Sequence, residues 1–182
     1  MIPLFNKPFF FCFVVLLMGK IYNLKSIQKL PVSLEQAWNF FSDPNKLLAV
    51  TPPFLNLKIT NKLFGDEVYA GQVMMYTVKP LFGIPVAWMT EITHVERLKL
   101  FVDEQRKGPY RLWHHQHHFK AIEGGVEMTD IVHYRLPFGI LGNMAHALSV
   151  KNRLKEIFTY RYFKINEIFG DWPGGEMSLR IE

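Results

Sequence analysis

The spacing of apolar and polar residues divides the chain into an opening segment, a block of strands and a C-terminal helix. Residues 21–30 alternate in part and predict a strand. Ser33 is expected to cap a short helix after it, because Gln36 stands three positions later and completes a capping box. Pro44 breaks this helix, and residues 45–50 predict a second short one.

The middle of the chain, from residue 54 to residue 137, has the pattern of successive strands. Glycine, proline and aspartate mark the breaks between them. Because the gaps are short, neighbouring strands are expected to pair as hairpins in an antiparallel sheet. The expected strands cover residues 55–60, 71–80, 84–96, 99–106, 110–122 and 126–136.

An apolar stripe near the C-terminus predicts one long helix over residues 141–168. Its members recur at a period of 3.6 residues, and a helix of this length would measure about 42 Å. Gly170 and Pro173 end it. The stripe consists of Ala147, Val150, Leu154, Ile157, Phe158, Ile165 and Ile168.

These elements predict an α+β fold. A sheet with one apolar face needs a cover, and the amphipathic helix can supply it. We therefore expect a curved antiparallel sheet of about six or seven strands around one long C-terminal helix, with two short helices after the first strand. Such an arrangement can leave a cavity between sheet and helix.

The first residues form a separate segment. Residues 8–18 are an apolar run of eleven residues, shorter than the ~20 that span a bilayer. The run has the length of a signal-peptide core, but no small-residue cleavage site follows it. A membrane-dipping anchor and translation that begins at Met18 are the other interpretations, and we favour the start at Met18. The predicted division is an extension over residues 1–19, a domain over 20–169 and a C-terminal tail over 170–182.

Composition and charge narrow the class of protein. Hydrophobic residues make up 49% of the chain and charged residues 20%, which excludes a disordered chain. The net charge of +5 is spread along the chain, so we expect a basic surface and no nucleic-acid partner. The only cysteine, Cys12, excludes an intramolecular disulfide and a cysteine-based zinc site. We expect a cytoplasmic protein, with membrane contact through residues 1–18 as the alternative.

Four of the seven histidines lie in the stretch RLWHHQHHF, residues 111–119. Alternation along a strand places Trp113, His115, His117 and Phe119 on one face. The two aromatic residues mark this face as the inner one. The other two histidines of the stretch then face solvent, and we assign them no role.

Two inward histidines could bind a metal if a third ligand were present. Asp103, Asp130 and His133 are the candidates, but alternation places His133 on the opposite face from Asp130. The ligand count stays incomplete, and we expect no metal.

A polar patch inside an apolar cavity is the alternative to a metal site. Phe101, Asp103 and Gln105 alternate onto one face of their strand, and Trp88, Thr90 and Ile92 alternate onto one face of the preceding strand. His115 and His117 can then pair with Asp103 or Asp130. The network either satisfies its own buried groups or orients the polar end of a ligand.

Arg161 adds a charge to the helix stripe. A buried arginine needs a partner, which could be Asp103, Asp130 or an anionic ligand group. The alternative is that its side chain extends to the rim of the cavity.

Local sequences are more specific than the order of the elements. They are PVSLEQAWNFFSDPNKL followed by TPP, FGIPVAWMTEI, FVDEQRKGPYRLWHHQHHF, TDIVHYRLPFGILG and LKEIFTYR. These stretches resemble the START-like superfamily, also called SRPBCC or helix-grip proteins, and within it the bacterial polyketide cyclase/dehydrase and coenzyme Q-binding START branch. The resemblance covers about residues 20–169 and implies a helix-grip fold with a hydrophobic ligand cavity. It fixes no reaction, since members include lipid carriers, hormone receptors and cyclases.

Our first hypothesis is non-catalytic binding or transport of a small hydrophobic ligand, such as a lipid, a quinone or a polyketide-like compound. One alternative is a cyclase or dehydratase that uses a His–Asp acid/base pair in the same cavity. Another is an accessory protein that docks on a membrane or a partner protein. No nucleophile, phosphate loop or redox-cofactor motif stands out, so we expect no cofactor. The expected ligand-binding residues are Trp88, Asp103, Gln105, Trp113, His115, His117, Phe119, Asp130, Tyr134 and Arg161.

Overall fold

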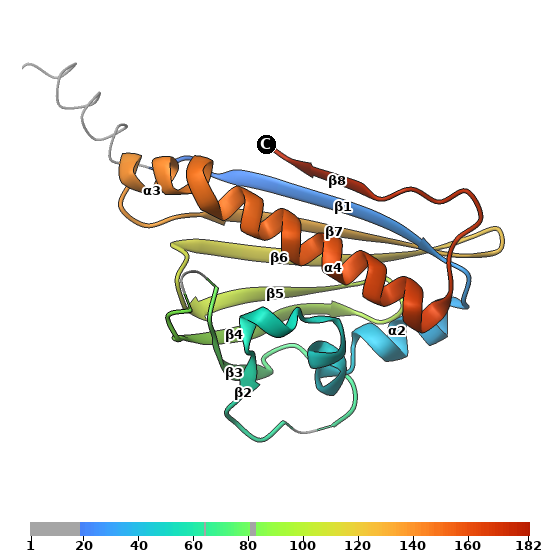
Figure 1. Ribbon diagram of the computed structural model, residues 1–182. Coiled ribbons are helices and arrows are strands. Elements are labelled where there is room, and N and C mark those ends of the chain that lie inside the picture. Colours follow the sequence, from blue (N-terminus) through green and yellow to red (C-terminus); the bar gives the residue numbers. More distant parts are fainter. Residues whose placement is uncertain (1–18, 64, 81–82) are drawn as a thin grey trace, which may run out of the picture.

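The computed structural model, which describes residues 19–63, 65–80 and 83–182, has one antiparallel sheet with a long helix across one face (Figure 1). The sheet has eight strands in the order β2-β3-β4-β5-β6-β7-β1-β8. This confirms the predicted α+β helix-grip fold. The expectations for the N-terminal extension fall almost entirely on residues 1–18, which lie outside the described part of the chain.

The elements have the following bounds. The strands are β1 Tyr22–Leu30, β2 Lys58–Ile59, β3 Val73–Val78, β4 Val86–Glu96, β5 Leu100–Lys107, β6 Leu112–Ile122, β7 Gly125–Arg135 and β8 Ser178–Ile181. The helical segments are α2 Leu34–Phe41, the 3₁₀ segments η1 Pro44–Val50 and η2 Pro53–Leu55, α3 Ile140–Ala145, the π-helical turn η3 His146–Val150, and α4 Lys151–Phe169. No helix in this part of the chain has the length and apolar character needed to cross a bilayer.

The opening segment follows its sequence pattern. The Ser33 hydroxyl accepts a hydrogen bond from the Gln36 N–H, and the Gln36 side chain accepts one from the Ser33 N–H. This reciprocal pair is the predicted capping box, and it fixes where α2 begins. Pro44 stands at the start of η1, where its missing N–H leaves no bond unmade.

Two features of the C-terminal half differ from the sequence prediction. Residues 178–181, expected as part of a tail, form β8 and pair with β1, which gives the sheet an eighth strand. The long helix is also interrupted, because η3 separates α3 from α4. At this turn His146 points inward, stacks on Tyr22 at 3.5 Å between ring centroids, and bonds the Tyr134 hydroxyl at 2.8 Å.

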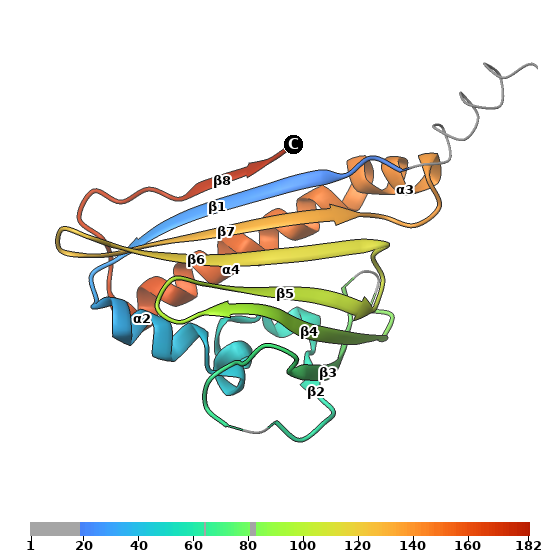
Figure 2. The ribbon, with the colours of Figure 1, turned by 180° about the vertical axis from the view of Figure 1, so that it is seen from behind.

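The helices cover one face of the sheet and leave the other bare. In Figure 2, seen from behind, α2 and α4 lie beyond the strands. Along the inner face of β6, Trp113 packs with the apolar cluster of Tyr22 and Leu24, whereas Phe119 belongs to the cluster of Trp38. Two polar positions therefore separate two apolar clusters, and the candidate site lies at this separation.

Candidate functional site

Strand β6 places its histidines on opposite faces, as its alternation predicts. His115 and His117 are buried, with 6% and 5% of their surface exposed. His114 and His118 are partly exposed on the outer face. Trp113 shares the inner face with His115 and His117 and contacts the edge of the His115 ring.

Two carboxylates hold the inner histidines between them. His115 donates from Nε2 to Asp130 Oδ1 at 3.0 Å, and its Nδ1 lies 3.3 Å from Asp103 Oδ2. His117 donates from Nε2 to the same Asp103 oxygen at 2.9 Å. Its Nδ1 lies 3.0 Å from Asp130 Oδ1 without the alignment of a hydrogen bond, so this contact is electrostatic only. The four groups, His115, His117, Asp103 and Asp130, form what we call the His–Asp cluster.

The charges of the cluster support one another. Burial by itself lowers the pKa of His115, but the charges and hydrogen bonds of Asp103 and Asp130 outweigh burial and raise it to about 9. Burial opposes ionisation of Asp130, yet the Arg161 charge and the contacts with the His115 and His117 imidazoles hold its pKa well below the usual range. The pKa of Asp103 is lowered in the same way, against burial, by His115 and His117. Protonated His115 and Arg161 thus balance the two carboxylates.

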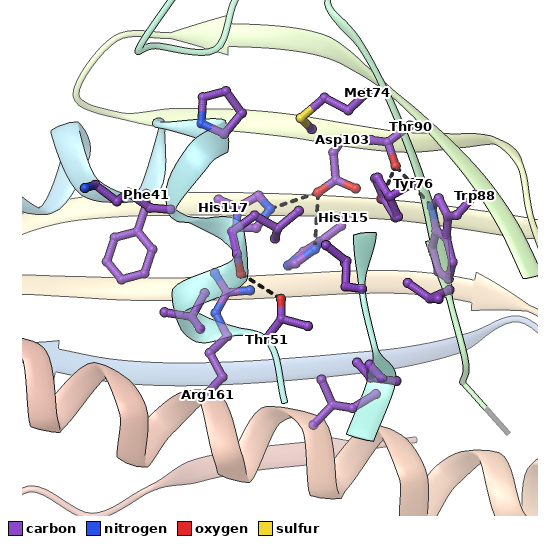
Figure 3. Close-up of a pocket in the computed structure, with 18 of the residues that line it drawn as sticks. Phe41, Thr51, Met74, Tyr76, Trp88, Thr90, Asp103, His115, His117 and Arg161 are labelled. Carbon is purple, nitrogen blue, oxygen red and sulfur yellow. Dashed lines mark hydrogen bonds and ion pairs between the residues drawn. The ribbon is translucent and has the colours of Figure 1, made fainter. Parts of the chain in front are cut away.

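Arg161 reaches the cluster from α4 (Figure 3). Its Nη2 lies 4.0 Å from Asp130 Oδ1, and its guanidinium lies 5.8 Å from the ring centroid of Phe41. Its Nε is buried and has no hydrogen-bond partner among the described residues. A guanidinium carries five N–H donors, so this one keeps donors available on the side that faces the cavity.

A cavity of about 210 Å³ lies between the sheet and α4, directly against the cluster. Its volume is more than ten times the ~10–15 Å³ that a single water needs. The sheet, η1, η2 and α4 all contribute walls. The apolar members include Phe41, Val50, Leu55, Met74, Val78, Trp88, Ile92, Phe101, Trp113, Leu154, Ile157 and Phe158.

A second polar group lies across the cavity on β3 and β4. The Thr90 hydroxyl bonds the Tyr76 hydroxyl at 2.5 Å and accepts a hydrogen bond from Trp88 Nε1 at 3.0 Å. Burial and the charge of Asp103 raise the pKa of Tyr76, so its phenol stays neutral. The Trp88 indole is thereby fixed against the rings of Tyr76 and Trp113.

Six of the ten predicted residues line this cavity. They are Trp88, Asp103, Trp113, His115, His117 and Arg161. The sequence did not identify Tyr76, although alternation of Met74, Tyr76 and Val78 on β3 offered the signal. The walls from η1 and η2 had no such signal, because 3₁₀ segments carry no simple periodicity.

The other four predicted residues lie elsewhere. Asp130 stands behind the imidazoles and supports them. Phe119 is part of the apolar core, packed against Trp38 and Phe101. The structure thus places these two residues beside the cavity rather than in its lining.

Gln105 and Tyr134 are tied to local structure. The Gln105 amide donates to the Tyr110 carbonyl at 2.7 Å and accepts from the Tyr110 N–H at 3.2 Å. It therefore fixes the turn that carries Tyr110 into the cavity wall. The Tyr134 hydroxyl bonds His146, which ties β7 to η3, and burial raises its pKa.

The cluster also contains the donors of a metal site. Ligand atoms of Asp103, His115 and His117 lie within 4.8 Å of one another, which supplies the third ligand that alternation left undecided. Two imidazoles and a carboxylate suit zinc or iron. In the structure His117 hydrogen bonds Asp103 and His115 hydrogen bonds Asp130, so a metal would have to displace the protons that now hold the cluster together.

Comparison with known proteins gives no match by sequence. No family model matches the chain, and no curated protein sequence matches it significantly. Solved structures do resemble it. A protein from Chromobacterium violaceum is 11% identical with a TM-score of 0.61, over 82% of this chain and 98% of that one.

Two further structures show the same likeness. A protein from Thermus thermophilus is 16% identical with a TM-score of 0.59, over 80% of this chain and 94% of that one. Ara h 8.0201, which has a Bet v 1 / START-like fold, is 13% identical with a TM-score of 0.53, over 81% of this chain and 99% of that one. At these identities the likeness establishes the helix-grip fold of this chain and nothing finer.

Proposed function

We propose that the chain binds a small ligand with an apolar body and an acidic head in the cavity between the sheet and α4. The observation that carries this proposal is Arg161. Its guanidinium lines the cavity, its Nε has no hydrogen-bond partner among the described residues, and its Asp130 partner lies 4.0 Å away and is already engaged by His115. A carboxylate of a ligand can accept two parallel hydrogen bonds from such a group.

The walls supply the recognition of the ligand body. Aromatic and aliphatic side chains from sheet and helix surround a space large enough for a small molecule. Binding sites of this kind are mostly apolar, with a few polar groups that fix orientation. The hydroxyls of Thr90 and Tyr76 supply a second polar contact for a carbonyl or phenol. Fatty acids, quinones with an acidic substituent and polyketide-like acids have this chemistry.

Native mass spectrometry of the full chain tests this proposal. We expect a retained or added ligand of this class when the protein is incubated with a panel of fatty acids, quinones and aromatic polyketide-like acids. Ile157→Trp should exclude the ligand by filling the cavity, since Ile157 is part of its wall. Phe163→Trp is the matched control, because Phe163 lies on the same helix and is 59% exposed. Absence of any complex across the panel would contradict the proposal.

Acid–base catalysis in the same cavity is the second candidate function. Both ring nitrogens of His115 face carboxylates, so protonated His115 has no lone pair with which to act as a base. The geometry is compatible with His115 as a proton donor or as a positioning group. If a panel compound is converted, His117→Gln should abolish turnover while the complex persists in the mass spectrum, whereas a binder shows no turnover in either protein.

A further inference from the structure

One end of the molecule exposes a group of apolar side chains to solvent. Phe138, Leu141 and Leu148 are 81%, 69% and 77% exposed, and Ile140 and Met144 are about half exposed. Leu141, Met144 and Leu148 follow one helical face at intervals of three and four residues. We call these five residues the α3 patch. Contiguous exposed apolar residues of this kind mark interaction surfaces.

One residue of the patch, Phe138, has an unfavourable backbone conformation. Phe138 has a φ of +66°, which a bulky residue rarely adopts. The following Gly139 also has a positive φ, of 53°. The Phe138 backbone is therefore strained while its ring is exposed to solvent. Backbone strain of this kind is typical of functional sites.

Basic residues outnumber acidic ones near the patch. Residues 131–155 contain four Lys or Arg and no Asp or Glu, although Glu156 follows and pairs with Arg153 at 2.7 Å. Lys20 reaches the same place, because its N–H donates to Asn143 Oδ1 at 3.1 Å. The Lys20 ammonium lies 5.1 Å from the centre of the Tyr22 ring, on which His146 stacks, and Lys151 follows η3 directly in the chain. Apolar side chains beside cations match a bilayer with anionic headgroups.

A second cavity lies directly beneath the patch. It measures about 240 Å³, and Phe138, Leu141 and Ala145 form part of its wall. Pro80, Tyr110 and Ile157 line both this cavity and the one against the His–Asp cluster. The second cavity therefore stands between the exposed patch and the proposed ligand site.

We propose that the α3 patch docks on an anionic lipid bilayer and that the second cavity is the passage between bilayer and ligand site. The passage rests on the proposed ligand-binding function, whereas docking does not. The sequence adds one consistent feature: the apolar run of residues 8–18 joins the described chain at Gly19, next to Lys20 and the patch.

Sedimentation of the full chain with vesicles tests the docking. The vesicles are phosphatidylcholine with or without phosphatidylglycerol. We expect binding to the anionic vesicles that weakens with salt, and a loss of about tenfold or more in Phe138→Ser/Leu141→Ser/Leu148→Ser. Phe163→Ser, an exposed phenylalanine of α4 outside the patch, should bind as the unmodified chain does.

Two outcomes would overturn the docking. One is equal vesicle binding by the triple variant. The other is a dimer in sedimentation velocity that the triple variant dissociates while vesicle binding is unchanged, which would make the patch a self-association surface.

The passage is tested with a fluorescent fatty acid. Ala145→Trp, at the wall of the second cavity, should slow transfer of this probe from vesicles severalfold without changing its equilibrium affinity in free solution. An unchanged transfer rate would overturn the passage. Absence of equilibrium binding in the unmodified chain would instead count against the ligand site itself, so the two proposals fail separately.

Discussion

The two faces of β6 place the same residue type in two different environments. On the inner face, His115 and His117 contact buried carboxylates at about 3 Å. On the outer face, His114 contacts Glu104 at 2.8 Å, also within hydrogen-bond distance. The contacts are alike, but solvent screens only the outer pair. Which face of the strand a histidine occupies, more than residue type or distance, decides how much its contact contributes to stability.

The pKa values show the consequence. The pKa of His115 is raised to about 9 because two carboxylates outweigh its burial. The pKa of His118, on the outer face, is lowered by partial burial and by the charge of His117. The pKa values of two histidines on the same strand are thus shifted in opposite directions.

The largest expected difference between the faces follows from removal of a carboxylate. Asp130→Ala leaves protonated His115 and Arg161 buried without their partner, and we expect a loss of about 3–5 kcal/mol in the free energy of unfolding. Glu104→Ala, which removes the outer partner, should cost about 1 kcal/mol or less. Urea unfolding measures both. Equal losses in the two variants would show that the inner pairs stabilise the fold no more than the outer pair does.

The pH dependence of stability should differ between the faces as well. His115 binds its proton more tightly in the folded chain, so its contribution is complete below pH ~6.5 and is lost as pH rises through about 9. The loss is on the order of 3 kcal/mol at most. The lowered pKa values of Asp103 and Asp130 act at the other end, where stability falls as pH drops below about 4.

The unfolding midpoint in urea, followed from pH 6 to 10, checks this prediction. His115→Gln should flatten the alkaline loss, and His114→Gln should leave it in place. A profile in which both variants behave alike would refute the raised pKa of His115.

A smaller difference is expected in the pairwise coupling energies. A double-mutant cycle on His117 and Asp103 should give about 1–3 kcal/mol, since the two side chains share a buried hydrogen bond. The same cycle on His114 and Glu104 should give about 0.5 kcal/mol or less. Equal coupling energies on both faces would contradict the claim that the buried inner pair is the stronger one.

The smallest effect is predicted for His118. Its ring bonds the Gln116 side chain at 2.8 Å on the outer face, among the residues that the structure describes. His118→Ala should change the free energy of unfolding by about 0.5 kcal/mol or less, as measured by urea unfolding. A loss of several kcal/mol would mean that this ring supports the inner cluster.

Sequence reasoning succeeded where the physics is local. Alternation on β6 and β7 separated inner from outer residues, including His133 from Asp130, because both strands pair over their whole length. The capping box located α2 for the same reason, since its atoms lie three residues apart. The apolar stripe placed Arg161 on the covered face of α4.

Other features depend on contacts between distant parts of the chain. Residues 178–181 become a strand only because β1 offers an open edge more than a hundred residues earlier in the chain. Phe119 belongs to the core because α2 brings Trp38 onto it. The convergence of Asp103 on both imidazoles needed the register of β5 with β6, which pairs Asp103 with His115. None of these partners can be read from spacing alone.

Calorimetric titration with a medium-chain fatty acid and its matched alcohol tests the central claim most directly. We predict that the unmodified chain binds the acid about 10–100-fold more tightly than the alcohol, and that Arg161→Met removes this preference while still binding both. Equal affinity for acid and alcohol in the unmodified chain, or the same preference in Arg161→Met, would contradict the claim that Arg161 receives an acidic head in an apolar cavity.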